Sequence, residues 1–291
     1  QDLFYHGFGK SNILVEVSKE YNVKINIVRS SDAAVVQTYM DIIYTSAGYS
    51  NYEVTNVSLK EKIDRRDYVV TDSPIIAIRY LLKGFKNNIV WFQGVSPEES
   101  YMRNKSKIRF KIINEIERYV LKKAKMLILV SDEMLRHYEI KYKLKLAEKS
   151  VIMPCFNETE IVETAFSQDK YEQNNFVYVG SLHAWQCFEQ TVKIYSDIEK
   201  TAKKPTKLYV YTFQKDLAEE ILKKYNIREY VVDCVEKEEL SKCIMKMKYG
   251  FVIREDCTVN HVATPTKFSN YLANGIIPIY SSALKSFSEF D

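Results

Sequence analysis

The second half of the chain alternates between short apolar runs and amphipathic stretches. Asn175–Leu182, Lys207–Phe213 and Tyr249–Arg254 are rich in β-branched and aromatic residues, which predicts strands. Helical patterns of ordinary length separate these runs, and such alternation is typical of a parallel sheet with helices on both faces. The other expected elements are strands at Tyr230–Val235 and Ile276–Ser281, and helices at Trp185–Lys203, Lys215–Tyr225, Lys237–Lys248 and Pro265–Asn274.

The first half follows the same alternation less regularly. A glycine-containing loop leads into a helix over Gly7–Tyr21, and Ser131-Asp132 is a typical helix N-cap pair. The other expected elements are strands at Val23–Val28, Tyr68–Thr71, Asn88–Phe92, Met126–Val130 and Ser150–Met153, and helices from Pro74, over Ser106–Lys125 and over Glu133–Tyr142.

A polar stretch without a clear period, Cys155–Asn174, separates the two series, and we take it as the linker region. We therefore expect an N-terminal domain over residues 1–157 and a C-terminal domain over residues 158–291, both Rossmann-like. The ends look abrupt, because a glycine-rich loop normally follows a first strand. We expect the sequence to omit a first strand and a C-terminal helix or two.

Charge and cysteine content narrow the classes of partner and the cellular compartment that we expect. Residues 1–150 carry 25 Lys and Arg against 18 Asp and Glu, whereas the remainder carries 17 against 20, so only the first half favours an acidic partner. The five cysteines form no C-x-x-C pair, which indicates a reducing compartment. No apolar run approaches the ~20 residues of a membrane helix, and no signal peptide is visible, so we expect a cytoplasmic protein.

The stretch ATPTKFSNYLANGIIPI, residues 263–279, contains the clearest chemical signal. Pro265 suits a first helical position, and Asn274-Gly275 suits a helix end. Lys267 in the first turn works against the helix dipole, which makes sense if a pyrophosphate binds there. The alternative is that Lys267 lies on a solvated helix face.

Several motifs in order resemble the GT-B glycosyltransferases. They are YVGSL followed by a Trp, RED and an Asn before ATPTKFSNYLANGIIPI, AKMLILVSDEMLRHY, and WFQGVSPEES. More narrowly, they resemble the retaining enzymes that build bacterial capsule and O-antigen polysaccharides. The resemblance implies two Rossmann-like domains facing a cleft, with a nucleotide-diphospho-sugar donor in the second and a glycan or polyprenyl-linked acceptor in the first. It implies no metal and no cofactor, the substrate being UDP- or GDP-linked.

The resemblance implies that Lys267 contacts the donor diphosphate, and we expect Arg254 to share this catalytic role. A salt bridge to Glu255 or Asp256 is the alternative for Arg254. Asn270 occupies a slot where many relatives have Glu, and Ser181 and Trp185-Gln186 stand where many have Arg and Lys. The expected donor-binding residues are Gly180, Ser181, Trp185, Arg254, Asn260, Thr264, Lys267 and Asn270.

The expected acceptor-binding residues are Gly7, Gly9, Gln93, Gly94 and Glu98. Gln93 and Gly94 follow an expected strand, while Glu98 and Glu99 would also be stabilised in the first turn of a helix without any functional role. The segment HGFGKSN is not a Walker motif, because that motif needs Gly where Phe4 stands.

Tyr101–Lys125 contains nine Lys and Arg but only two Glu, together with a stripe of apolar residues from Ile108 to Val120. We expect the stripe to face the core, whereas the excess charge indicates peripheral contact with an anionic membrane.

Two other functions compete with sugar transfer. An NAD-dependent dehydrogenase or epimerase would need G-x-G-x-x-G after a first strand, and the sequence contains none. A non-catalytic sugar-binding or nucleic-acid-binding protein is the third hypothesis. Nucleic acid is disfavoured because the isoelectric point is about 8.5 and the second half is acidic.

Overall fold

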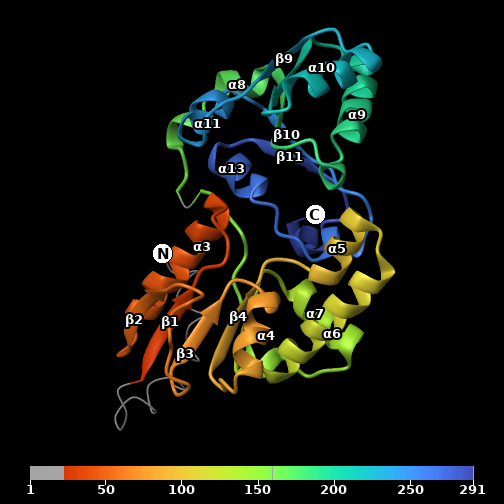
Figure 1. The fold of residues 1–291 in the computed structure, drawn as a ribbon. Helices are drawn as coiled ribbons and strands as arrows, with labels where there is room; N and C mark the ends of the chain where they lie inside the picture. Colours follow the sequence, from red (N-terminus) through yellow and green to blue (C-terminus); the bar gives the residue numbers. More distant parts are fainter. Residues whose placement is uncertain (1–22, 159, 291) are drawn as a thin grey trace. The chain divides into compact units, whose positions relative to one another are not determined.

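The chain divides into two compact units, Gln1–Pro154 and Cys155–Asp291 (Figure 1). The structure, a computed structural model, describes residues 23–158 and 160–290, so the expected loop with Gly7 and Gly9 lies outside the described residues. Each unit contains one parallel sheet with helices between its strands, which confirms the predicted α/β class with two Rossmann-like folds.

The first unit contains a six-stranded sheet in the order β2-β1-β3-β4-β5-β6, and every described pair is parallel. The strands are β1 (Lys24–Val28), β2 (Glu53–Val57), β3 (Tyr68–Thr71), β4 (Asn88–Phe92), β5 (Met126–Leu129) and β6 (Ser150–Ile152). The helices are α3 (Ala34–Gly48), α4 (Pro74–Leu82), α5 (Ser96–Asn104), α6 (Lys107–Lys123) and α7 (Asp132–Tyr142), with a 3-10 turn, η1 (Ala147–Lys149).

The second unit contains a five-stranded parallel sheet in the order β11-β10-β7-β8-β9. The strands are β7 (Asn174–Val179), β8 (Thr206–Tyr211), β9 (Tyr230–Asp233), β10 (Tyr249–Val252) and β11 (Ile277–Tyr280). The helices are α8 (Gln168–Glu172), α9 (Phe188–Thr201), α10 (Lys215–Lys224), α11 (Lys237–Ile244), α12 (Thr258–His261) and α13 (Lys267–Ala273), with 3-10 turns η2 (Glu163–Ala165), η3 (Ala184–Gln186) and η4 (Lys285–Phe290).

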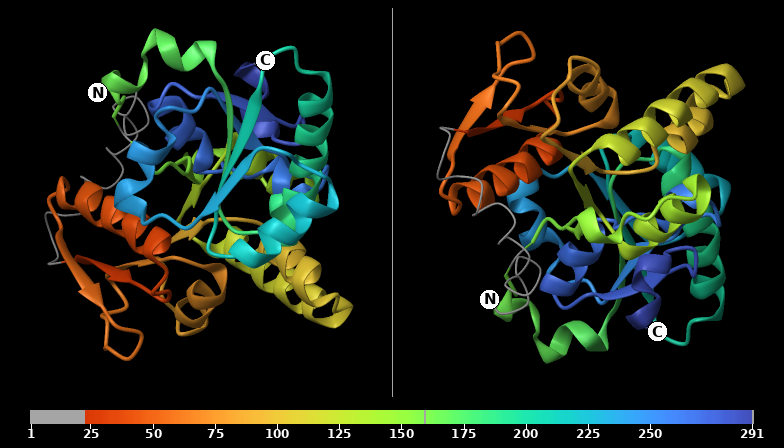
Figure 2. Two further views of the ribbon diagram at one scale, coloured as in Figure 1. Left: turned by 90° about the horizontal axis from the view of Figure 1, so that it is seen from above. Right: turned by 90° about the horizontal axis from the view of Figure 1, so that it is seen from below.

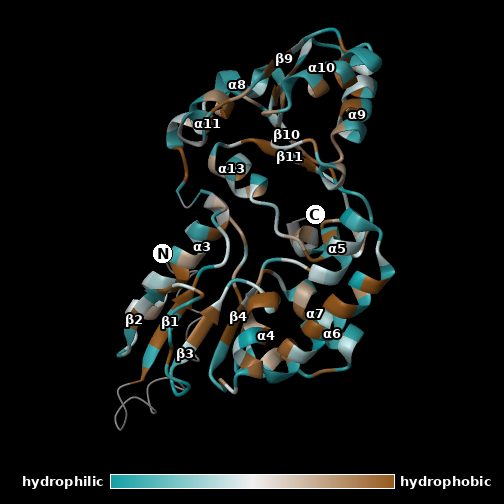
Figure 3. Ribbon diagram, viewed as in Figure 1, coloured by the Kyte–Doolittle hydropathy of each residue, from teal (hydrophilic) through white to brown (hydrophobic). Residues whose placement is uncertain are grey.

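Both faces of the second sheet are buried. Along β7, Phe176 and Tyr178 pack in one apolar cluster while Val177 packs in another, as expected when successive side chains point to opposite faces. In the first unit all residues of β3 and β4 are buried, and the strands stand out as hydrophobic in Figure 3. This double burial is why the strands appear in the sequence as continuous apolar runs.

The sequence pattern missed α3 and β2. β2 lies at the edge of its sheet and pairs only with β1, so its sequence EVTNV is largely polar. α3 contains several β-branched residues and ends at Gly48, and these residue types weaken a helical signal.

Two predicted helices begin later than expected. The expected helix from Trp185 is interrupted, because Cys187 has a left-handed backbone, and α9 begins only at Phe188. The expected helix from Pro265 begins at Lys267, which makes Lys267 the first residue of α13.

The stretch expected to be a linker is instead part of the second unit. The backbone N–H of Val162 donates to the carbonyl of Ala273 at 2.8 Å. The buried Lys170 amine donates to the carbonyls of Asn274 and, at 3.1 Å, Ala165, and burial lowers the Lys170 pKa to about 8. This stretch therefore holds the C-terminal end of α13, where a cation interacts favourably with the helix dipole.

The helices α5 and α6 pack against each other and project from the edge of the first unit (Figure 2, yellow). Ser106 caps α6 by accepting a hydrogen bond from the Arg109 N–H at 3.3 Å. The expected N-cap at Ser131 is confirmed, since its hydroxyl accepts from the Met134 N–H at 3.0 Å.

Gly250 in β10 gives a test of the second core. A Cβ on Gly250 would lie 2.5 Å from Cε2 of the buried Tyr271 ring. We expect Gly250→Ala to lower the free energy of unfolding by ~1–3 kcal/mol, because the added methyl group overpacks the core. Urea denaturation measures this change. Gly48→Ala is the matched control, because nothing lies within 4 Å of its Cβ position. Equal effects of the two substitutions would contradict this packing.

Candidate functional site

The site of interest lies at the carboxyl edge of the second sheet. From β7 the chain runs to β8 and β9 on one side, then crosses to β10 and β11 on the other side. The order therefore reverses between β7 and β10, and ligands of open parallel sheets bind at such a switch point. Gly180 follows β7 and Arg254 lies just beyond β10, so both lie at this place.

Lys267 reaches from the first turn of α13 to Gly180. A Cβ on Gly180 would lie 3.2 Å from Lys267 Nζ, and the φ of +127° at Gly180 is strained for other residues. The Lys267 amine donates to Gln186 Oε1 at 2.8 Å and lies 4.2 Å from the centre of the Tyr178 ring. Gly180 thus provides the space that the Lys267 side chain occupies.

Arg254 is held on the same side of the unit and is only 6% exposed. Its Nη1 donates to the carbonyls of Ile253 at 2.9 Å and Gln186 at 3.4 Å. Its backbone exchanges two hydrogen bonds with the Ser281 hydroxyl, at 3.0 and 2.8 Å. Gln186 therefore contacts both cations, one through its side chain and the other through its backbone.

Neither cation has an acidic partner in the part of the chain that the structure describes. No carboxylate of residues 23–158 and 160–290 lies within 4 Å of Lys267 or Arg254. Asp256, one of the expected partners of Arg254, pairs with His261 instead. Burial, and then repulsion by Arg254, holds the pKa of Lys267 well below its usual value, and burial lowers the pKa of Arg254. An anion that bound here would relieve both costs.

Three other expected donor-binding residues lie around α12 and α13. The Thr264 hydroxyl accepts from the Cys155 N–H at 2.9 Å, and the buried Asn260 amide donates to the Glu255 carbonyl at 3.0 Å. Asn270 is buried, and its Oδ1 has no hydrogen-bond partner in the described part of the chain. Thr264 and Asn260 therefore have structural roles, while Asn270 offers an unsatisfied acceptor.

The loop after β7 includes an aromatic pair. Trp185 lies on η3 and stacks on the exposed His183 ring with centroids 4.7 Å apart. The Ser181 carbonyl accepts from the Tyr178 hydroxyl at 2.7 Å, which fixes the start of this loop.

The first sheet has its own switch point, between β1 and β3 among the described strands. There the buried Asp72 carboxylate accepts from the Ser30 N–H at 2.7 Å and from the Ser30 hydroxyl. The exposed Gln93 donates from Nε2 to the Asp72 carbonyl at 2.9 Å. Gln93, expected to bind the acceptor, thus shares the carboxyl edge with Ser30 and Asp72, two residues that the sequence did not indicate.

Glu98 and Gly94 lie further along the same connection. Glu98 pairs with Lys141 at 2.8 Å, and Lys141 also lies 3.3 Å from the fully buried Glu117. Burial raises the pKa of Glu117 to about 7. The Gly94 carbonyl accepts from Tyr138 at 3.1 Å. Glu98 therefore lies in the first turn of α5, as its position predicted, and is also tied into a buried cluster through Lys141.

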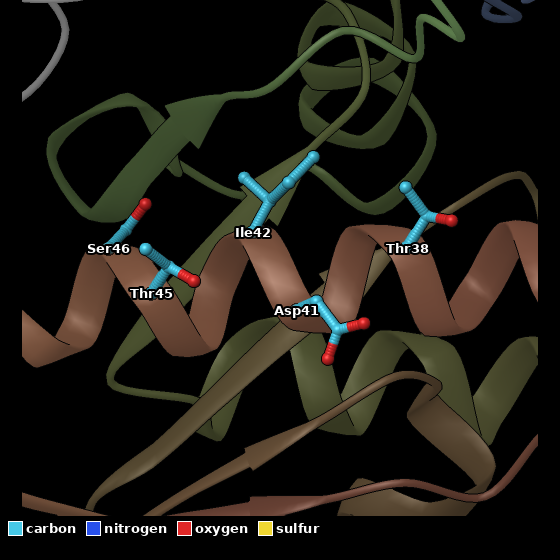
Figure 4. A pocket seen from close by; sticks show the side chains of 5 residues that line it. All are labelled: Thr38, Asp41, Ile42, Thr45 and Ser46. Atoms are coloured by element: carbon cyan, nitrogen blue, oxygen red, sulfur yellow. The ribbon is translucent and has the colours of Figure 1, made fainter.

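Two surface hollows lie away from these sites. Figure 4 shows one along α3, where Thr38, Asp41, Ile42, Thr45 and Ser46 line it. Asp41 there pairs with Arg29 at 2.6 Å. The other hollow lies around the amino ends of β7 and β8, opposite the Lys267 edge of that sheet. Neither hollow has cationic side chains at the carboxyl end of a strand, as the Lys267 site does.

No protein-family model matches the chain, and no curated protein sequence does. Among solved structures it is similar to WaaG, a glycosyltransferase involved in lipopolysaccharide biosynthesis, with a TM-score of 0.61 at 12% identity over 91% of this chain and 83% of that one. It is also similar to the lipopolysaccharide outer core galactosyltransferase WaaB, with a TM-score of 0.55 at 12% identity over 89% and 81%. The chain has the GT-B fold.

A third similar structure is S. aureus TarM, with a TM-score of 0.55 at 9% identity. The match covers 79% of this chain but only 44% of TarM, so less than half of TarM has a counterpart in this chain. The GT-B fold confirms the architecture that the motifs implied. The chemistry has to be argued from the residues of the site.

Sequence reasoning identified Lys267, Arg254 and Gly180, which the fold brings together, but it missed Gln186 and Tyr178 as their partners. The only signal for Gln186 was that Trp185-Gln186 stands where many relatives have a basic residue. Tyr178 looks like any buried strand residue, so no signal could have marked it.

We expect the pair of cations to lower the free energy of unfolding of the protein without ligand. Between the lowered pKa of folded Lys267 and 10.5 the unfolded state binds more protons, so stability rises with pH across this window. We expect Lys267→Met to raise the free energy of unfolding by about 1 kcal/mol at neutral pH. The gain should shrink as the pH approaches 10.5, as followed by urea denaturation at several pH values.

Lys193→Met on the exposed side of α9 is the matched control and should change stability little. A Lys267→Met variant less stable than the parent at neutral pH would show that its cation is already compensated.

Proposed function

We propose that the chain is a glycosyltransferase that transfers a sugar from a nucleotide-diphospho-sugar to a glycan acceptor. In this proposal the donor diphosphate binds to Lys267 and Arg254 in the second unit. The observation that carries the proposal is a pair of repelling cations at the sheet's switch point, a buried Arg254 and a half-buried Lys267, which have no carboxylate partner among the described residues.

The arrangement suits a leaving group that gains negative charge. When the bond from the sugar to the diphosphate breaks, charge develops on the phosphate oxygens, and cations that are already in place stabilise it without rearrangement. Lys267 would exchange its hydrogen bond to Gln186 for one to phosphate, while Arg254 could offer a forked contact. Two side-chain cations supply the neutralisation that otherwise needs a metal, which supports metal-independent transfer.

The nucleotide and its sugar account for other features of the same unit. The unsatisfied Asn270 Oδ1 can accept from a ribose hydroxyl, in place of the Glu of many relatives. The stacked Trp185 and His183 rings offer an apolar face to a base or a sugar ring. The TarM structure contains UDP, so UDP is the first nucleotide to test.

On the acceptor side, Gln93 and Ser30 present polar groups at the carboxyl edge of the first sheet, with Asp72 positioning both. Together they suit the hydroxyl groups of a glycan. The names of WaaG and WaaB both refer to lipopolysaccharide, which supports a role in bacterial surface polysaccharide synthesis. Retention of the anomeric configuration, transfer of a hexose and a polyprenyl-linked acceptor follow from the motif resemblance and belong to the same proposal.

The NAD-dependent alternative has less support, because the similar structures named above are glycosyltransferases. A calorimetric titration separates the classes: UDP, GDP or CDP should bind, NAD should not, and binding of NAD alone would reject sugar transfer. Binding of none of them would leave the non-catalytic hypothesis. Slow hydrolysis of one nucleotide-sugar in a panel would then identify the donor.

Lys267→Ala tests the site itself. Removing a charge-assisted hydrogen bond to phosphate should weaken binding of the nucleoside diphosphate by at least ~1 kcal/mol, about fivefold in Kd. Lys193→Ala serves as the control and should leave Kd unchanged. Equal affinity of Lys267→Ala and the parent would remove Lys267 from the site.

A further inference from the structure

One carboxylate lies among the apolar residues by which α6 packs on the first unit. Val120, Leu121 and Glu117 are all fully buried, on the same side of this helix. By contrast, Ile108 is 75% exposed and Ile112 is 57% exposed, so the expected core-facing stripe is wrong at its first two positions. Neither α6 nor any other described helix is both long and apolar enough to cross a bilayer. The packing of α6 therefore explains its buried apolar residues but not its buried acid.

The donors to the Glu117 carboxylate come from two other helices. Oε1 accepts from the Tyr142 hydroxyl at 2.7 Å and from the Lys141 amine at 3.3 Å, both in α7. Oε2 accepts from the backbone N–H of Ser96, the first residue of α5, at 3.2 Å. Burial still raises the pKa of Glu117 to about 7, although Lys141 and Tyr142 act to lower it. The charged form is therefore unfavourable in the fold, and stability alone does not account for it.

The residues around Glu117 also hold the connection between β4 and α5. The Tyr138 hydroxyl lies 3.1 Å from the Gly94 carbonyl and 3.4 Å from Glu117 Oε2, and the nearer carbonyl is the better placed acceptor for its single proton. Lys141 pairs with Glu98, in the first turn of α5, at 2.8 Å. Glu117 and its two neighbours in α7 therefore fix this connection at its middle and at the start of α5.

Gln93 is the residue that the connection presents at the candidate acceptor site. It is exposed and comes directly after β4, and its Nε2 donates to the Asp72 carbonyl at 2.9 Å. Phe92 before it and Val95 after it are fully buried. A binding side chain keeps its place only when the residues that support it are themselves held. The strand supplies that support on one side of Gln93, and the Glu117 cluster supplies it on the other side.

We propose that Glu117 is a positioning residue for the acceptor, because its buried carboxylate holds the connection between β4 and α5 where Gln93 meets an acceptor hydroxyl. The inference rests on the proposed function, in which Gln93 contacts the acceptor. Glu117 is fully buried, so it acts through the connection and does not touch the substrate. A displaced contact weakens binding of the acceptor and leaves the donor site unchanged, so the effect falls on the acceptor KM and not on kcat.

Kinetics with a nucleotide-sugar and a panel of octyl glycosides as acceptors test this proposal. In Glu117→Gln the amide oxygen should stay with Lys141 and Tyr142, which places the NH2 group against the Ser96 N–H. The KM for the octyl glycoside that the parent uses best should rise about tenfold, with kcat within about twofold of the parent. Tyr138→Phe frees the Gly94 carbonyl and should raise the same KM. The Kd of UDP, measured by calorimetry, should stay that of the parent in both variants.

Tyr142→Phe is the matched control. The Tyr142 hydroxyl lies 2.7 Å from the other oxygen of the same carboxylate and 3.0 Å from Asn114 Oδ1, and both partners belong to α6. Its loss should lower Tm, as the loss of a buried hydrogen bond does, but should leave the acceptor KM unchanged. Glu115→Gln, on the exposed side of α6, should change neither quantity. Thermal unfolding of every variant separates a change of KM from misfolding.

The proposal is overturned if Glu117→Gln and Tyr138→Phe keep the acceptor KM of the parent. It is also overturned if Tyr142→Phe raises that KM equally, since the cluster would then serve stability alone. Hydrolysis of the nucleotide-sugar without transfer to any glycoside would overturn the acceptor role of the connection while the donor site stands. A parent that neither binds UDP nor hydrolyses a nucleotide-sugar would instead reject the proposed function itself, and this inference with it.

Discussion

Lys267 and Arg254 are two positive charges that the fold of the second unit holds close to each other and largely away from water, without an acidic partner among the described residues. Much of the surrounding structure serves this arrangement. Gly180 leaves space for the lysine, Gln186 contacts both cations, and Ser281 fixes the arginine backbone. A site built in this way is destabilising when empty and favourable when an anion fills it.

The position of Lys267 depends on how α13 is held at its other end. Lys170 donates to the Asn274 carbonyl, and the Tyr171 hydroxyl donates to Gly275 at 2.7 Å. Both residues come from the polar stretch that follows the boundary between the units. A seven-residue helix has little stability of its own, so these contacts, together with the buried Phe268 and Tyr271, keep its first residue in place.

The two halves of the chain differ in where their positively charged side chains lie. The first half has an excess of positive charge, and much of it is on the solvent-facing side of α6. The second half is acidic overall, yet it holds a buried Arg254 and a half-buried Lys267 at one point of its sheet. Net charge therefore reflects the exposed side chains of the first half, while the charged site could be seen only as a local arrangement.

The sequence by itself determined the alternation of strands and helices, because doubly buried strands such as Tyr68–Thr71 and Asn88–Phe92 must be continuously apolar. It also singled out Lys267, since a cation in a first helical turn opposes the helix dipole. It missed β2 and α3, whose polar edge and β-branched residues weaken the pattern. Only the tertiary structure decided the strand order, the neighbours Gln186 and Tyr178, and the exposure of Ile108, because these depend on contacts between residues far apart in the chain.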